Sequence, residues 1–230
     1  VAVVPLLLSL AWIRRFNHLA GLIEAESDYA QRQRERAGQE HELAGRIARR
    51  LDAPNVETPA GLLLRTLYHP AEGVVGGDFL GTGTAGDEVL FVVGDVIGHG
   101  LDAAINALRV KDLVLTAMLT GAPLPAVLAL ANTHLCADPS GEALATVFVA
   151  RYGSGVLRYV NAGHLPGHLF DGGTDQPLPP SGPLLGLLDD PTYEERQVAL
   201  EPGFRLVVYT DGLLDAYGRL GGLGDQEVVE

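Results

Sequence analysis

The sequence has 230 residues, of which 47% are hydrophobic and 6% aromatic, so a core of ordinary size must be built mainly from aliphatic side chains. Its formal net charge is -13, and this acidity lies in residues 51–230, because residues 1–50 hold eight arginines against six acidic residues. An acidic domain repels nucleic-acid phosphates, so we expect no nucleic-acid partner. The single cysteine, Cys136, excludes an internal disulfide and a cysteine-based zinc cluster.

The chain begins with an apolar run, VAVVPLLLSLAWI, which is followed directly by Arg14 and Arg15. This run is shorter than the roughly 20 residues that a helix needs to span a bilayer. We interpret residues 1–15 as the end of a truncated transmembrane helix, with the arginine pair on the cytoplasmic side. A signal-peptide core and a buried helix are the alternatives. The interpretation predicts a cytoplasmic domain tethered to the inner face of the cell membrane.

Residues 16–55 are rich in helix formers and predict a long polar helix that serves as a linker. Leu43, Ile47 and Leu51 follow one another at intervals of four residues and form a thin apolar stripe. Such a stripe is typical of a dimerising coiled coil or a signalling linker, and a solvated helix lying on the domain explains it equally well. A homodimer through this helix is therefore one of two expectations.

Beyond a loop at residues 52–61, short apolar runs cut by glycine predict buried strands. Residues 171–192 are rich in proline and glycine and predict a loop. Strands followed by two helices and further strands indicate an α+β layered fold, which we place at residues 60–230. The expected helices are 101–120 and 123–137, and the expected strands are 62–71, 88–96, 143–152, 155–163, 164–170, 193–200 and 204–212.

Three aspartates share a local pattern in which an apolar strand leads to Asp and then to small or tightly turning residues. They are Asp78 in VVGGDFL, Asp95 in FVVGDVIGHG and Asp211 in LVVYTDGLLDA. Carboxylates at the ends of packed strands can converge, and their repulsion raises pKa values unless a cation lies between them. Each aspartate alone is explained as a turn former or helix cap. Together they predict a site for Mg²⁺ or Mn²⁺, which prefer oxygen ligands.

The motifs PAEGVVGGDFL, VVGDVIGHGLDAA, YVNAGHLP and VVYTDGLLDA, in this order, resemble the SpoIIE/RsbU group of PPM-type, metal-dependent serine/threonine protein phosphatases. The resemblance covers residues 60–220. It implies an α-β-β-α sandwich, in which helices flank a central antiparallel β-sandwich, with two Mn²⁺ or Mg²⁺ ions at one end. By this resemblance Asp95 bridges both metals, the carbonyl of Val96 binds one, Asp211 binds the other, and Asp78 binds a metal or a metal-bound water.

The same resemblance implies hydrolysis of phosphoserine or phosphothreonine by a metal-activated water. The implied substrate is a phosphorylated regulatory protein of the anti-sigma factor antagonist type. No covalent phosphoenzyme is expected, which agrees with the absence of a convincing activated cysteine or serine in the sequence.

The sequence departs from the family pattern in two places. Leu80 and Gly81 replace an aromatic residue and a second acid of the usual GGDFYD, and we expect little effect on the metals. The family ends with a strand whose Asp-Asp-Xaa-Thr motif completes the site, and that motif is absent before Glu230. Asp189 and Asp190 precede the TDG strand and cannot replace it. We therefore expect either a phosphatase domain truncated at its C-terminus or a catalytically weak or inactive signalling or binding module with the same fold.

The histidines near these motifs are expected to have structural roles. His99 lies between two glycines and is expected to shape its loop. His164, in NAGH, is expected to fix its loop through a hydrogen bond rather than to bind metal. His69 and His168 are also expected to be structural.

Overall fold

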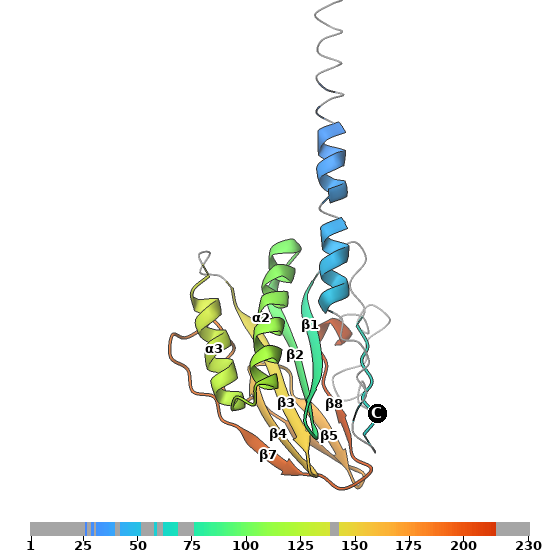
Figure 1. Cartoon of the computed structure of the whole chain (residues 1–230), viewed down its shortest axis with the longest axis vertical. Coiled ribbons are helices and arrows are strands. Elements are labelled where there is room, and N and C mark those ends of the chain that lie inside the picture. Colours follow the sequence, from blue (N-terminus) through green and yellow to red (C-terminus); the bar gives the residue numbers. More distant parts are fainter. Residues whose placement is uncertain are drawn as a thin grey trace, which may run out of the picture. The chain divides into compact units, whose positions relative to one another are not determined.

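A computed structural model describes residues 26, 29, 31–39, 42–51, 58, 62–68, 76–138 and 143–214. The chain divides into two compact units, Val1–Leu43 and Ala44–Glu230. Residues 31–39 of the first unit are helical, and the second unit contains all the labelled strands and helices of Figure 1. The predicted end of a transmembrane helix, residues 1–15, lies outside the described residues. Within the described ranges, no helix is long and apolar enough to cross a membrane.

Two antiparallel sheets form the centre of the second unit. The first has the strand order β1-β2-β3-β4-β7, and the second has the order β6-β5-β8. The strands of the first sheet are β1 (Gly76–Ala85), β2 (Glu88–His99), β3 (Ala145–Gly153), β4 (Val156–Ala162) and β7 (Arg196–Ala199). Those of the second are β5 (Gly167–Asp171), β6 (Thr174–Leu178) and β8 (Arg205–Val207).

Two consecutive helices, α2 (Leu101–Leu119) and α3 (Leu124–Cys136), cover one face of the five-stranded sheet (Figure 1). Helix α2 contacts β1 and β2, and its buried side is mostly alanine and valine, which allows the helix to lie close to the sheet. On the opposite face, Phe148 stacks on Tyr159 with ring centroids 5.5 Å apart, and both pack with Leu169 of the second sheet. The layers confirm the predicted α+β fold with an antiparallel sandwich.

The helical residues 42–51 lead into the domain, and their last turn belongs to its core. Ile47 and Leu51 are buried in the same apolar cluster as α2. The ammonium group of Lys111, itself buried on α2, donates a hydrogen bond to the carbonyl of Arg50. Two members of the predicted stripe therefore pack on the domain, whereas Leu43 is exposed. Dimerisation through the preceding residues stays a prediction.

Two sequence-based assignments of secondary structure were wrong, and strand β1 was not among the expected strands. Residues 62–68, expected within a strand, have no regular secondary structure; their side chains alternate between half-buried and exposed, but no described strand pairs with them. The predicted loop at 171–192 contains strand β6, which pairs with β5 across the turn at Gly172 and Gly173. Both glycines have positive φ, 57° and 84°, as a two-residue hairpin turn requires.

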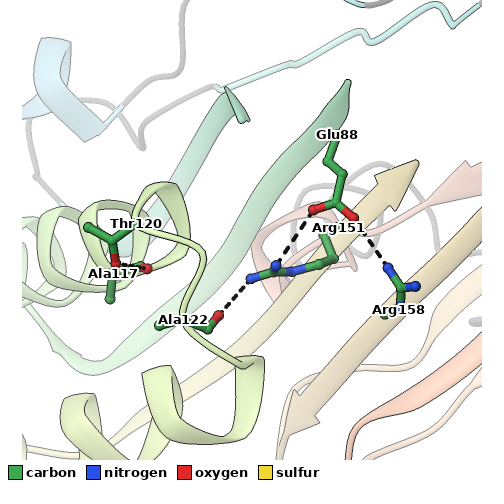
Figure 2. A network of polar contacts seen from close by, with 6 residues as sticks. All are labelled: Glu88, Ala117, Thr120, Ala122, Arg151 and Arg158. Carbon is green, nitrogen blue, oxygen red and sulfur yellow. Dashed lines mark hydrogen bonds and ion pairs between the residues drawn. The ribbon is translucent and has the colours of Figure 1, made fainter. Parts of the chain in front are cut away.

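A polar network ties three strands to the turn between the helices (Figure 2). Arg151 of β3 donates a hydrogen bond of 2.7 Å to the carbonyl of Ala122, and its other terminal nitrogen lies 3.5 Å from Glu88 of β2. Arg158 of β4 lies 3.2 Å from the second oxygen of the same carboxylate. Only 13% of the Arg151 side chain is exposed, so this guanidinium depends on Glu88 for its counter-charge.

We expect Glu88→Gln to lower the free energy of unfolding by about 1–2 kcal/mol, because it removes the charge shared by two arginines, one of them largely buried. Urea unfolding followed by circular dichroism measures this. Glu194→Gln is the matched control: its pair with Arg196 is solvent-exposed, with 67% and 36% of the two side chains accessible, and should contribute less than about 0.5 kcal/mol. Equally small effects for both variants would show that the network does not stabilise the sandwich.

Candidate metal centre

The structure brings Asp78, Asp95 and Asp211 together, with one carboxylate oxygen of each within 4.8 Å of the others. Asp78 lies directly opposite Asp95 in the antiparallel pairing of β1 and β2, which puts both side chains on the same face of the sheet. Asp211 begins a helical turn at 211–214, shortly after β8. The three ligand candidates therefore come from two strands of the first sheet and from the segment that follows β8.

The strand-end pattern expected from the sequence is correct only for Asp211. Asp78 is the third residue of β1, which continues to Ala85, and Asp95 is followed by four more residues of β2. The carboxylates meet because the two strands are antiparallel: the beginning of one lies beside the end of the other. The pattern identified the right residues but gave the wrong reason for their convergence.

The carboxylates of Asp78 and Asp95 face the interior of the sandwich. Val96, the neighbour of Asp95, is buried in the helix-side core, so the preceding side chain points to the opposite face. Thr146 lies directly opposite Asp95 on β3, two residues before Phe148, which packs toward the second sheet. The carboxylates thus lie on the face that meets the second sheet, where their charges are partly removed from water.

Burial and mutual repulsion disfavour the charged form of this cluster. The pKa of Asp95 rises to about 7, first because of burial and then because of the charges of Asp78 and Asp211. Burial also raises the pKa of Asp78, a hydrogen bond from the Thr210 side chain lowers it, and the charge of Asp211 raises it. The Oδ1 atom of Asp78 is buried and has no hydrogen-bond partner within the part of the chain that the structure describes.

The backbone of Val96 lies beside the carboxylates because residue 77 is glycine. A Cβ atom at Gly77 would lie 1.9 Å from the Val96 carbonyl oxygen and 2.9 Å from Oδ1 of Asp95, so no other residue fits without displacing them. The pairing of β1 with β2 shifts register at this point, between Gly76 and Asp78. An unpartnered buried carboxylate oxygen, two further carboxylates and a nearby backbone carbonyl are a donor set that fits a hard divalent cation.

Position 81, where the resemblance implies an acid, faces the helix layer. A Cβ atom on Gly81 would lie 2.8 Å from Cγ1 of Val92 and 3.5 Å from side-chain atoms of Leu115 and Lys111. A side chain there would begin on the face opposite the carboxylates. This placement supports the expectation that the departure at 81 has little effect on the metals.

None of the described histidines near these motifs belongs to the carboxylate cluster. His99 is exposed at the end of β2. The Nδ1 atom of His168 lies 3.1 Å from a carboxylate oxygen of Asp175 on the neighbouring strand β6. His164 is buried and hydrogen-bonded within its turn. His69 lies outside the described residues. Asp189 and Asp190 are exposed in the loop before β7 and are not part of the cluster.

Sequence reasoning missed two residues around the cluster. Thr210, which donates to Asp78, immediately precedes Asp211 in the quoted TDG motif, so its position in that motif was an available signal. Thr146 had no such signal, because only the register of β2 with β3 places it opposite Asp95.

We expect the metal-free protein to lose stability as the pH rises from about 4 to about 7. The folded-state pKa of Asp95, about 7, exceeds the ordinary value of 3.8. Between these two pH values the folded protein holds a proton that the unfolded chain has released, so the free energy of unfolding falls as the pH rises, and the whole stabilisation by this proton is lost above pH 7. Asp95→Asn removes the repulsion and should raise the melting temperature by about 3 °C or more at pH 8 in EDTA, with little change at pH 4. Scanning calorimetry measures both values.

Asp102→Asn is the control for this comparison, because Asp102 is an exposed residue in the first turn of α2, outside the cluster. It should keep the pH dependence of the wild type. If Asp95→Asn were destabilising at pH 8 without metal, repulsion would not be the dominant interaction at this site.

Comparison with known proteins agrees with this geometry. The family model described as Stage II sporulation protein E (SpoIIE) matches residues 85–230. Phosphoserine phosphatase RsbU of Bacillus subtilis is 26% identical over 180 residues, which are 76% of this chain and 53% of RsbU. Phosphoserine phosphatase RsbP of the same organism is 27% identical over 131 residues, 54% of this chain and 32% of RsbP. The chain thus spans about half or less of the length of these curated relatives.

Two solved structures are also similar to this chain. The RsbU and RsbW domains of Rv1364c from Mycobacterium tuberculosis are 28% identical with a TM-score of 0.55, covering 61% of this chain and 40% of that one. The PP2C phosphatase domain of SpoIIE from Bacillus subtilis, at 18% identity, shares the fold with a TM-score of 0.57 over 65% of this chain and 45% of that one. The chain belongs to the SpoIIE family, within the SpoIIE/RsbU-type PPM serine phosphatases.

Proposed function

We propose that this chain hydrolyses phosphoserine or phosphothreonine on a regulatory protein in a reaction that depends on Mn²⁺ or Mg²⁺. The observation that carries the proposal is the meeting of three carboxylates, of which Asp78 and Asp95 are half-buried and Asp211 is exposed. One oxygen of Asp78 is buried and has no hydrogen-bond partner in the described residues. Two divalent ions, when bound, supply a nucleophilic water at neutral pH and offset the negative charge of the phosphoryl group.

The residues of the cluster divide the binding between them. Asp95, which interacts with both other carboxylates, would hold both ions. The Val96 carbonyl and Asp211 would each contribute to one of them, and Asp78 would hold an ion or its water. Thr210 keeps one oxygen of Asp78 hydrogen-bonded and therefore oriented. Gly77 keeps the space next to the Val96 carbonyl free of side-chain atoms.

The proposed substrate is a phosphorylated protein of the anti-sigma factor antagonist type. Support comes from the relatives named phosphoserine phosphatase and from the Rv1364c structure, which joins an RsbU to an RsbW domain. The acidity of residues 51–230 favours a protein surface with basic groups around the phosphoserine over a nucleic acid.

We further propose that the helix before the domain transmits a signal to it. Ile47 and Leu51 of its last turn pack in the same apolar cluster as α2, and Lys111 of α2 donates a hydrogen bond to the Arg50 carbonyl. Helix α2 in turn contacts β1 and β2, the two strands that carry Asp78 and Asp95. A structural change in the linker is therefore connected through packed side chains to the two strands that carry these carboxylates. The homodimer and the membrane tether remain predictions.

Gly77→Ala should weaken Mn²⁺ binding by at least about tenfold, because the added Cβ displaces the Val96 carbonyl and crowds Asp95. Gly76→Ala, one residue away, is the matched control: its Cβ meets nothing closer than 3.8 Å, so Mn²⁺ affinity should stay close to that of the wild type. Isothermal titration calorimetry measures both. Equal affinities in the two variants would argue against a role for the Val96 carbonyl.

Asp95→Asn and Asp211→Asn should each lower the Mn²⁺-dependent release of phosphate from a phosphoserine protein by about 100-fold or more, because each removes a charged ligand. EDTA should abolish the activity, and Asp102→Asn should keep it. Wild-type rates in both cluster variants would refute the proposed mechanism. Mn²⁺ binding by the wild type without phosphate release would instead favour the non-catalytic module.

A further inference from the structure

His164 lies in the turn after β4 and is fixed on several sides. Only 3% of the residue is exposed, and its backbone N–H donates a hydrogen bond of 2.8 Å to the side-chain oxygen of Asn161. Asn161 is itself fully buried, and its amide nitrogen donates to the carbonyls of Leu165 and Leu178. The position of the imidazole is therefore set by the fold and not by solvent.

The imidazole lies between the two segments that supply the carboxylates. Its Nδ1 atom is 2.9 Å from the hydroxyl oxygen of Thr146, the residue directly opposite Asp95. The backbone of Tyr209, two residues before Asp211, also interacts with the ring. His164 thus contacts one neighbour from the first sheet and one from the segment that follows β8.

The hydrogen-bonding capacity of the ring is only partly used. Burial lowers the pKa of His164 to about 4, and the Tyr209 backbone opposes this effect, so the ring is neutral at pH 7 with one N–H and one acceptor. If the Thr146 hydroxyl donates to Nδ1, the hydrogen is on Nε2. That atom is buried and has no hydrogen-bond partner of ordinary geometry among the described residues. A buried donor without a full partner favours any movement that supplies one.

We propose that His164 is a positioning residue for Asp211: its Nε2–H donates to the backbone carbonyl of Tyr209 when the three carboxylates close around divalent cations. This hydrogen bond, together with that of Nδ1 to Thr146, connects the strand pair β2–β3, which carries Asp95, to the segment after β8, which carries Asp211. The inference rests on the proposed function, because it requires cations at the cluster. His164 neither binds the metal nor touches the substrate; it fixes the place from which the third carboxylate reaches the site.

The test compares His164→Gln with His164→Asn in the 230-residue chain by calorimetric titration with Mn²⁺. A glutamine amide nitrogen replaces Nε2 and can still donate to Tyr209, whereas an asparagine replaces only Nδ1. We expect His164→Gln to bind Mn²⁺ within about threefold of the wild type and His164→Asn to bind it about tenfold or more weakly. Metal-free melting temperatures should be similar in the two variants, since both lose the ring.

Equal Mn²⁺ affinities in two folded variants would overturn the inference and leave the proposed function standing. A wild type that binds no Mn²⁺ would overturn both.

A second measurement needs no substitution. Nitrogen-15 spectra of the wild-type histidine rings report which nitrogen of His164 carries the hydrogen, with and without Mg²⁺. An Nε2–H tautomer supports the inference, and an Nδ1–H tautomer overturns it.

Discussion

Repulsion between three carboxylates is the interaction on which the rest of this structure depends. Asp78, Asp95 and Asp211 meet within 4.8 Å in a partly buried site, where burial and neighbouring charge raise the pKa values of the first two. This repulsion opposes folding, so the aliphatic core and the antiparallel strand pairing must hold the three carboxylates together. A divalent cation would offset this repulsion, as the proposed function requires.

The two sheets contribute unequally to the cluster. Asp78 and Asp95 are fixed by the register of β1 with β2, under a helix layer that also holds Ile47 and Leu51. Asp211 follows β8, which has only three residues, and depends on local contacts for its place. The site therefore exists only where the sheets pack together.

Much of the fold and of the site was predictable from local sequence patterns. Both helices and most strands had clear periodicity, and the motif order identified the family. The shift in register beside Gly77 and the meeting of Thr146 with Asp95 were not predictable, because they follow from pairing between strands distant in sequence. Strand β6 was missed because its exposed polar residues carry no apolar pattern. The side chains of residues 62–68 alternate between half-buried and exposed, as in a strand, but no described strand pairs with them. The pattern within a segment does not show whether another strand lies beside it.

We propose that the three carboxylates together bind two divalent cations. Crystals of the protein grown with Mn²⁺ and measured at the manganese absorption edge test it most directly. We expect two anomalous peaks between the side chains of Asp95, Asp78 and Asp211, with the carbonyl oxygen of Val96 coordinating one of them. An ordered cluster with no anomalous density at saturating Mn²⁺ would contradict it.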